Sequence, residues 1–429
     1  MSGNARAFLS DLFRTAVGAA HPASCLPPLL PRPPAGRVIL LAAGKAAGSM
    51  AEVAEDFYLN KLKLNPRRLC GIAVARHGYG RPLKVVTMIE AGHPVPDAAG
   101  LEAAERALTL ANGAGADDLV LVLMSGGASA NWIAPAAGVS FADKQAVTRA
   151  LLRSGAVIGE INTVRKHLSR IKGGRLARRA FPAKLVTIAI SDVPGDDPSA
   201  IGSGPTVPDP TTLADARAIV AKYKLDLPAS VTAALGDANN ESPKPGDPAF
   251  AGGQFALAAR PFDSLRAAEA AVRAAGYDCF SLGANVEGEA RAVAAAHAKL
   301  TRELRGQGRR AVIISGGELT VTIRGQGRGG PNQEYALALA IELADMAAVA
   351  AVAGDTDGTD GGVGAATDPA GALLDGETVA RAKALGLDAA AFLADNNSTG
   401  FFTALGDLLM PGPTFTNVND FRAIVVDRP

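Results

Sequence analysis

The sequence has few aromatic residues, almost no net charge and no long apolar run. Phe, Trp and Tyr make up 5% of the chain, so the stacking platforms typical of single-strand nucleic-acid binding are not expected. The 43 basic and 42 acidic side chains leave a formal net charge of +1, which creates no global field to gather nucleic acid or a membrane surface. No apolar run approaches the ~18 residues that a membrane-spanning helix needs. These absences argue against a nucleic-acid or membrane partner.

Cysteine is also scarce. The three cysteines, Cys25, Cys70 and Cys279, are scattered along the chain and form no CxxC pair. An odd, scattered set argues against a disulfide framework and fits a reducing compartment. Residues 1–20 place apolar side chains at helical spacing rather than in the continuous run of a signal peptide. The sequence therefore predicts a cytoplasmic protein.

The length and the pattern of the chain predict two domains. At 429 residues the chain exceeds what one hydrophobic core usually supports, since such cores stop growing near roughly 250–300 residues. Apolar strand-like runs alternate with helical patterns throughout, which is typical of parallel sheets covered by helices. Residues 236–254 are polar and rich in proline, glycine and asparagine, and are the best linker candidate. We predict two parallel-sheet α/β sandwich domains of Rossmann-like type, at 1–240 and 250–429, with a cleft between them.

Two apolar runs of the chain end in Ser-Gly-Gly, at residues 125–127 and 315–317. Glycines after a strand let backbone N–H groups approach a ligand closely, and ligands of open α/β sheets bind outside the carboxyl ends of the strands. We therefore predict two backbone cradles for substrate or nucleotide, formed by Ser125, Gly126, Gly127, Ser315, Gly316 and Gly317. A plain turn is an equal alternative for the first loop.

Two charged residues stand at predicted strand ends. Lys45 stands at the end of the predicted strand 37–45 and begins a helix, where the helix N-terminus and the lysine charge together suit an anion. The GxxxxGK[ST] pattern of a P-loop is absent, and an ordinary exposed lysine is the alternative. Asp192 comes directly after a predicted strand, a usual place for a base or metal carboxylate. Asp196 and Asp197 follow it in a loop, where a turn-forming role is the alternative.

Residues 324–334, RGQGRGGPNQE, combine two arginines, four glycines and a helix start. Arg324 and Arg328 are candidates for clamping phosphate oxygens, with a solvated basic loop as the alternative. Asn332 and Glu334 stand in the first helical turn, where a capping role is the alternative. The segment also spells GxGxxG, but the preceding LTVTI run alternates apolar and polar residues, unlike the buried first strand of a dinucleotide fold. The segment thus indicates anion binding. It is compatible with a nicotinamide site but does not by itself indicate one.

Asp355, Asp357 and Asp360 lie in a glycine-rich stretch, AGDTDGTDGG, after a predicted strand. Mg²⁺ favours one or two carboxylates together with phosphate oxygens, so we predict Asp355 and Asp357 as metal ligands. An EF-hand is not expected, because Ala366 stands where its bidentate glutamate should be. A hydrophilic turn is the alternative. His93, in a proline-stiffened loop, is equally suited to bonding backbone or substrate.

Eight stretches together carry a specific pattern. They are GKAAGSMA (44–51), AGHPVPD (91–97), LMSGGASA (123–130), INTVRKHLSRIKGGRLA (161–177), SDVPGDDPSAIGSGPT (191–206), SGGELTVTIRGQGRGGPNQE (315–334), GDTDGTDG (354–361) and DNNST (395–399). Jointly they resemble the glycerate 2-kinases, a family whose bacterial members often carry the name hydroxypyruvate reductase. The resemblance implies phosphorylation of D-glycerate to 2-phosphoglycerate with ATP and Mg²⁺, a second domain of MOFRL type, and an active site between the domains.

The same resemblance implies roles for individual residues. Lys45 matches the lysine that the family is thought to use in catalysis. Many members have an arginine directly before the NQE helix start, where this chain has Pro331, and Arg328 is the candidate that replaces its charge. Our hypothesis is that Lys45 stabilises the transferred phosphoryl group and that Asp192 orients or deprotonates the acceptor hydroxyl. Asn332 is expected to join the binding loops.

Two other functions are weighed against a kinase. One is an NAD(P)H-dependent hydroxypyruvate reductase, which the GxGxxG pattern keeps open. The other is a non-catalytic small-molecule sensor, against which the carboxylates and lysine at strand ends argue statistically. A homo-oligomer is compatible with the sequence, which does not decide the oligomeric state. The sequence also does not decide which loop binds ATP and which binds glycerate.

Overall fold

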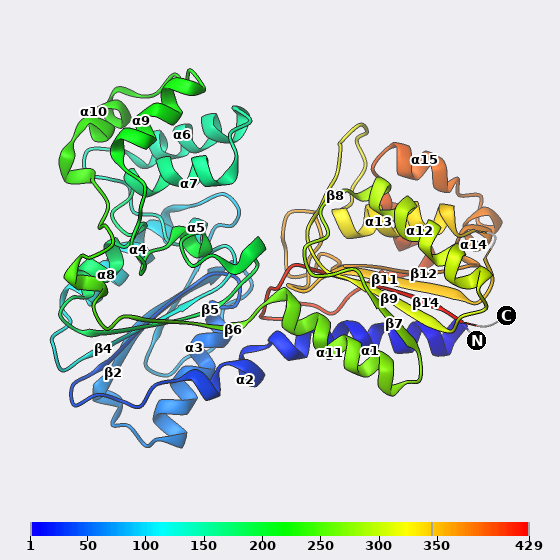
Figure 1. Cartoon of the computed structure of the whole chain (residues 1–429), viewed down its shortest axis with the longest axis horizontal. Helices are drawn as coiled ribbons and strands as arrows, with labels where there is room; N and C mark the ends of the chain where they lie inside the picture. Colours follow the sequence, from blue (N-terminus) through cyan, green and yellow to red (C-terminus); the bar gives the residue numbers. More distant parts are fainter. Residues whose placement is uncertain (1, 345, 428–429) are drawn as a thin grey trace. The chain divides into compact units, whose positions relative to one another are not determined.

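The structure is a computed structural model that describes residues 2–344 and 346–427. The chain divides into two compact units (Figure 1). The central unit is Leu26–Ala258, and the terminal unit combines Met1–Cys25 with Ala259–Pro429. Each unit is built around a six-stranded sheet with helices packed on it, which confirms the predicted α/β class. Among the described residues, no helix is both long enough and apolar enough to cross a membrane.

The sheet of the central unit has the order β3-β2-β1-β4-β5-β6. Its strands are β1 (Val38–Ala43), β2 (Leu69–Arg76), β3 (Thr87–Ala91), β4 (Leu119–Met124), β5 (Lys184–Ile190) and β6 (Gln254–Ala259). Strands β1 to β5 pair in parallel, as the continuous apolar runs VILLAA and LVLVLM predicted. Strands β2 and β3 lie on one side of β1, and β4 and β5 lie on its other side, so the strand order reverses between β1 and β4. Ligands of open parallel sheets bind in the crevice at this switch point.

The helices of the central unit form two groups. The first packs around the sheet and includes α3 (Ala47–Asp56), α4 (Ala98–Asn112), α5 (Ala128–Asn131) and α8 (Arg175–Ala180). The second shares a separate apolar core and appears as a cluster in Figure 1: α6 (Phe141–Arg153), α7 (Ile158–His167), α9 (Leu213–Lys222) and α10 (Ala229–Gly236). Ser140 caps the start of α6, since its side chain accepts a hydrogen bond from the Asp143 N–H.

The sheet of the terminal unit corrects the prediction of a second parallel sheet. Its order is β13-β12-β11-β14-β9-β7, and only β7 and β9 pair in parallel. The other four pairings are antiparallel. The strands are β7 (Asp278–Ser281), β9 (Ala311–Ser315), β11 (Val349–Asp355), β12 (Gly371–Asp375), β13 (Leu408–Leu409) and β14 (Asp420–Val426). The reason is the connection: a loop without a crossover helix joins β11 to β12, which allows the antiparallel pairing.

The helices of the terminal unit come from several parts of the chain. They are α1 (Ser2–Ala20), α2 (Pro22–Cys25), α11 (Pro261–Ala274), α12 (Ala290–Gly306), α13 (Pro331–Glu342), α14 (Thr378–Ala384), α15 (Ala389–Ala394) and α16 (Ser398–Leu405). The apolar stripe of α1 packs with Leu265, Val352 and Phe421. The sequence-based range 1–240 assigned this helix to the first domain, whereas its stripe completes the core of the terminal unit.

Two local features also differ from the sequence-based description, and a third concerns the helices at residues 161–180. The linker candidate 236–254 belongs to the central unit and leads into β6, the last strand of that sheet. Of the LTVTI run, only β10 (Leu319–Thr320) is a strand, and it pairs with β8 (Gly288–Glu289). The basic helical stretch 161–180 is interrupted between α7 and α8 by Gly173 and Gly174, whose φ angles of 58° and 78° fall in the left-handed region that favours glycine.

Candidate functional site

The loops that follow β1 and β4 are locked together at the crevice of the central sheet. The backbone N–H of Lys45 donates to the Gly126 carbonyl at 2.8 Å, and the Ala46 N–H donates to the buried Ser125 Oγ at 2.9 Å. Gly44 has a φ angle of 117°, and a Cβ at this position would lie 2.4 Å from the Ser125 carbonyl oxygen. The contact therefore requires glycine and fixes the position of Lys45 against the Ser-Gly-Gly loop.

Two side chains flank the glycine at the end of this loop. A Cβ on Gly127 would lie 2.8 Å from His93 Cδ2 and 3.4 Å from Lys45 Cγ. The amides of Lys45 and Ala46, directly before α3, are bonded to the loop and are therefore not open to an anion. Within the described part of the chain, the N–H groups of Gly126 and Gly127 donate no hydrogen bond. These two amides and the Lys45 ammonium group are therefore candidates for contacting an anion at this edge.

Asp192 lies at the same edge of the sheet, two residues beyond β5, and is half-buried. The fully buried Ser191 before it accepts a hydrogen bond from the Val193 N–H at 3.2 Å, which fixes the turn that carries Asp192. Since β5 is the neighbour of β4, the Asp192 turn and the Ser-Gly-Gly loop follow adjacent parallel strands. The role of Asp192 as a base stays a prediction.

The second Ser-Gly-Gly loop, after β9, is held by a buried arginine. Arg422 donates to the Ser315 Oγ at 3.3 Å, to the Gly316 carbonyl at 2.6 Å and to Asp420 at 2.8 Å. The Gly316 N–H donates to the Gly283 carbonyl at 2.9 Å. A Cβ on Gly317 would lie 2.2 Å from the Val286 carbonyl oxygen. Several polar groups of Ser315 and Gly316 are thus bonded within the protein rather than open to a ligand. The ligand cradle at Ser315, Gly316 and Gly317 stays a prediction.

Asn332, at the start of α13, lies between two buried carboxylates. Its Nδ2 donates to Asp420 at 2.6 Å and to Asp360 at 3.2 Å. Asp360 also accepts the backbone N–H groups of Asn332 and Gln333, at 3.0 and 2.9 Å. Asp360 therefore caps the N-terminus of α13, unlike Asp355 and Asp357, which were predicted as metal ligands. The Asn332 Oδ1 is buried and has no hydrogen-bond partner among the described residues.

Asp355 and Asp357 share one turn at the end of β11. The Asp357 N–H donates to Asp355 Oδ1 at 2.9 Å, and the Thr359 N–H donates to Asp357 Oδ1 at 2.8 Å. No group of three or more His, Cys, Asp or Glu side chains suited to a metal occurs in the described part of the chain. Two carboxylates on one turn fit Mg²⁺ only where phosphate oxygens and water complete its octahedral shell.

Comparison with known proteins identifies the family. Residues 8–236 match the family described as a domain of unknown function, DUF4147, and residues 311–420 match the MOFRL family. The chain is 40% identical over 402 residues to the glycerate 2-kinase of Pyrococcus horikoshii, covering 91% of this chain and 88% of that protein. The crystal structure of the glycerate kinase from Thermotoga maritima has a TM-score of 0.87 and 37% identity, covering 99% of this chain and 100% of the other. The chain belongs to the glycerate 2-kinase family.

Not every relative carries a kinase name. A protein of Agrobacterium vitis with the provisional name hydroxypyruvate reductase is 46% identical over 429 residues, covering 99% of this chain and 95% of that protein. The two names occur within one group of similar sequences, so the name of a relative alone does not choose between kinase and reductase. The geometry of the glycine-rich loop bears on that choice.

In this glycerate 2-kinase family member, residues 324–330 pack against the segment that precedes α16. The N–H groups of Arg324 and Gly325 donate to Asn396 Oδ1 at 2.7 and 3.0 Å, and the Gln326 N–H donates to Asp395 Oδ1 at 2.9 Å. A Cβ on Gly325 would lie 2.4 Å from the backbone of Asp395. The glycines thus permit close packing within the protein, and these amides are not open to a dinucleotide. The Arg328 side chain is exposed, which leaves its guanidinium able to meet a phosphate.

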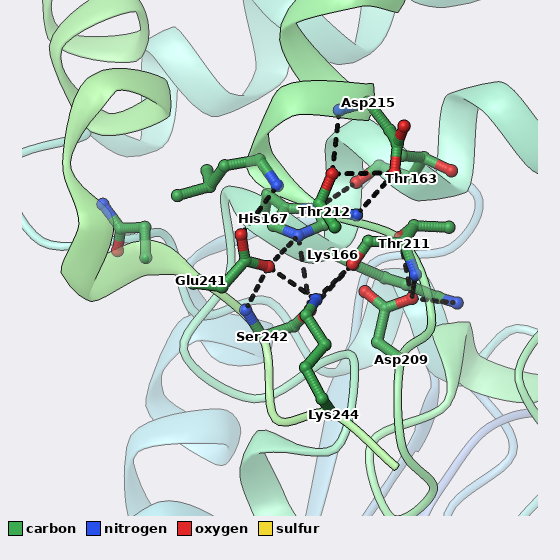
Figure 2. Close-up of polar contacts among 12 residues, drawn as sticks. Thr163, Lys166, His167, Asp209, Thr211, Thr212, Asp215, Glu241, Ser242 and Lys244 are labelled. Atoms are coloured by element: carbon green, nitrogen blue, oxygen red, sulfur yellow. Dashed lines mark hydrogen bonds and ion pairs between the residues drawn. The ribbon is translucent and has the colours of Figure 1, made fainter.

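The basic helix α7 is anchored by a buried polar network (Figure 2). His167 Nε2 lies 3.1 Å from Glu241 Oε1 and 3.3 Å from Ser242 Oγ, and its Nδ1 lies 2.9 Å from the Thr163 carbonyl. The serine and the carboxylate approach the same ring nitrogen, whereas a catalytic triad needs them on opposite nitrogens. Lys166 pairs with Asp209 at 3.4 Å in the same network. The network therefore positions α7 and has no nucleophilic role.

The buried Asp360 predicts a pH-dependent stability. Burial raises the pKa of Asp360 to about 7, the hydrogen bond from the Asn332 backbone opposes this, and the nearby Asp420 charge raises it further. The native state therefore favours protonated Asp360, and this contribution to stability is lost as the pH rises through 7. We expect Asp360→Asn to flatten the dependence of the unfolding free energy on pH between about 5 and 7.5, measured by urea denaturation. Parallel wild-type and variant profiles would contradict the assignment.

Proposed function

We propose that this protein transfers the terminal phosphoryl group of ATP to the 2-hydroxyl of D-glycerate, giving 2-phosphoglycerate and ADP. Membership of the glycerate 2-kinase family over nearly the whole chain supports the activity. The observation that carries the proposal is the locked junction at the β1/β4 crevice, where Lys45 lies beside the unbonded amides of Gly126 and Gly127. Phosphoryl transfer depends mostly on positioning and charge stabilisation, which this junction supplies.

In the reaction, the glycerate 2-hydroxyl oxygen forms a bond to the terminal phosphorus as the bond to the bridging oxygen of ADP breaks. The ammonium group of Lys45 stabilises the charge on the transferred phosphoryl group. The Asp192 carboxylate orients the hydroxyl and takes up its proton. Arg328 adds a second positive charge in place of the arginine that Pro331 replaces. The rigid attachment of Lys45 to the Ser-Gly-Gly loop keeps this charge in place without reorganisation during the reaction.

Asp355 and Asp357 would hold Mg²⁺ together with phosphate oxygens of the nucleotide. When bound, the cation neutralises charge on the phosphates. Asp357→Asn is therefore expected to raise the Mg²⁺ concentration for half-maximal activity more than the KM for D-glycerate. The measurement is a set of initial rates across a Mg²⁺ series at fixed ATP.

The matched control for this variant is Asp388→Asn, because Asp388 is exposed and asparagine also caps the helix α15 that it begins. We expect the control to keep the wild-type metal dependence. A folded Asp357→Asn enzyme with unchanged metal dependence would show that the carboxylate does not contact the cation.

One set of assays tests the activity against the alternatives. The enzyme is incubated with D-glycerate and MgATP, and separately with hydroxypyruvate and NADH or NADPH. We expect a phosphorus NMR signal of 2-phosphoglycerate in the first mixture and no cofactor oxidation in the second. A product that is only 3-phosphoglycerate would overturn the regiochemistry, and reductase activity without kinase activity would overturn the function.

A further inference from the structure

The central unit contains a small pocket whose lining includes four cationic side chains, one of which, Arg149, is exposed. Its volume is about 160 Å³, and its lining includes Lys144 from α6, Arg165 from α7 and Lys172 from the segment before α8. Pro94 and Ser129 also line the pocket. Ligand pockets for drug-sized molecules are larger, about 300–1,000 Å³, so the pocket suits a small anion rather than a nucleotide.

The two lysines of the pocket are almost completely removed from solvent. Lys144 and Lys172 are each 2% exposed. Lys144 Nζ donates to the Arg165 carbonyl at 3.1 Å, and Lys172 Nζ donates to the Ser129 carbonyl at 2.9 Å. An ammonium group has three donors, so each lysine has donors left for a ligand. Burial lowers the pKa of both lysines, and the charge of Arg165 lowers it further in each case.

Among the described residues, no carboxylate serves as a counter-ion for the positive charges of the pocket. Over the described ranges 2–344 and 346–427, no acidic side chain pairs with Lys144, Arg165 or Lys172. A buried charge without a partner is costly, and proteins seldom keep one without a use. Three such cations around one cavity are the arrangement that an anionic ligand would complete.

The pocket and the Lys45 junction are built from the same two loops. His93 packs on Gly127 beside Lys45, and the next residue, Pro94, lines the pocket. Ser129, two residues beyond Gly127, lines it as well. A small molecule held there lies within a few residues, along both loops, of the groups assigned to phosphoryl transfer.

We infer that the pocket formed by Lys144, Arg165 and Lys172 binds the carboxylate of the phosphoryl acceptor, a small 2-hydroxy acid. This assigns the acceptor to the central unit. It rests on the proposed function for the identity of the acid. The three cations supply charge-assisted hydrogen bonds to the carboxylate, and the small volume excludes longer sugar acids.

The test is a calorimetric titration of the full-length protein with D-glycerate, made without nucleotide and again with Mg²⁺ and a non-hydrolysable ATP analogue. Lys172→Met and Arg165→Met should each raise the Kd for D-glycerate by about tenfold to a hundredfold, the effect of losing a charged hydrogen bond. The affinity for the ATP analogue should stay unchanged. Arg153→Met is the matched control, since Arg153 is an exposed cation at the end of α6.

Thermal unfolding separates ligand binding from a structural role. Replacing an unpaired buried charge with a hydrophobic residue of similar size is neutral or stabilising, so the Tm of ligand-free Lys172→Met should equal or exceed that of the wild type. A lower Tm with unchanged D-glycerate affinity would assign Lys172 to structure and overturn the inference.

The outcomes also separate the pocket from the function. If the wild type phosphorylates D-glycerate and both folded variants bind it normally, the pocket assignment is wrong and the kinase activity stands. If the variants lose D-glycerate binding but the wild type transfers no phosphoryl group, the pocket stands and the proposed reaction is wrong. If the wild type binds no D-glycerate under either condition, the pocket assignment is overturned.

Discussion

Lys45→Ala is expected to lower kcat by roughly 10²–10³ while leaving the free energy of unfolding nearly unchanged. The loss corresponds to one electrostatic contact of about 2.7–4 kcal/mol in a site from which water is excluded. The fold should tolerate the change because the bond from Lys45 to Gly126 uses the backbone N–H, which alanine keeps. Initial rates and urea denaturation measure the two quantities on the same preparation.

Lys84→Ala serves as the control, because Lys84 is an exposed lysine of the same unit. A charge that acts only as the phosphoryl group moves should change kcat more than the KM for D-glycerate. A folded Lys45→Ala enzyme with nearly normal kcat would remove the central residue of the mechanism. Arg328→Ala is a weaker test, since a mild effect there would only direct attention to Arg324.

The sequence predicted the central sheet well because local pattern and tertiary position agree there. The runs that became β1 and β4 are apolar at every residue, as strands covered on both faces must be. The same logic failed in the terminal unit. An apolar run such as β14 carries no information on strand direction, and its antiparallel insertion between β9 and β11 depends on long-range packing. The strand β12 lay in a glycine-rich region that contains no strong strand pattern.

The candidate site was predictable where single strands end in a loop. The position of Lys45 at a strand end was inferred from the sequence, but its attachment through Gly44 and Ser125 is a contact between distant segments. The role of Asp360 as a helix cap was missed because the spacing of the aspartates suggested a metal loop. Nothing in the sequence indicates that Lys144 and Lys172 line one pocket, since each lies on a different segment and resembles an ordinary surface lysine.

Asp209→Ala is expected to destabilise the protein strongly, because it would leave a buried lysine without its partner. Asp209 is 0% exposed and Lys166 is 5% exposed, and the two form an ion pair of 3.4 Å within the network of Figure 2. Asp209 also accepts a hydrogen bond of 2.7 Å from the Thr211 hydroxyl. Breaking a buried pair by removing one partner costs about 3–5 kcal/mol, which is a large part of the stability of an ordinary domain.

Urea denaturation of the wild type, Asp209→Ala and the double variant Lys166→Met/Asp209→Ala checks this expectation. Burial raises the pKa of Asp209, but bonds from Thr211 and the charge of Lys166 outweigh it and lower the pKa overall. The stability that Asp209 contributes is therefore present at neutral pH and is lost as the pH falls through its native pKa. The double variant should recover much of the lost stability, because it no longer buries an unpaired ammonium group. If Asp209→Ala is as stable as the wild type at neutral pH, the ion pair with Lys166 does not hold α7 in place.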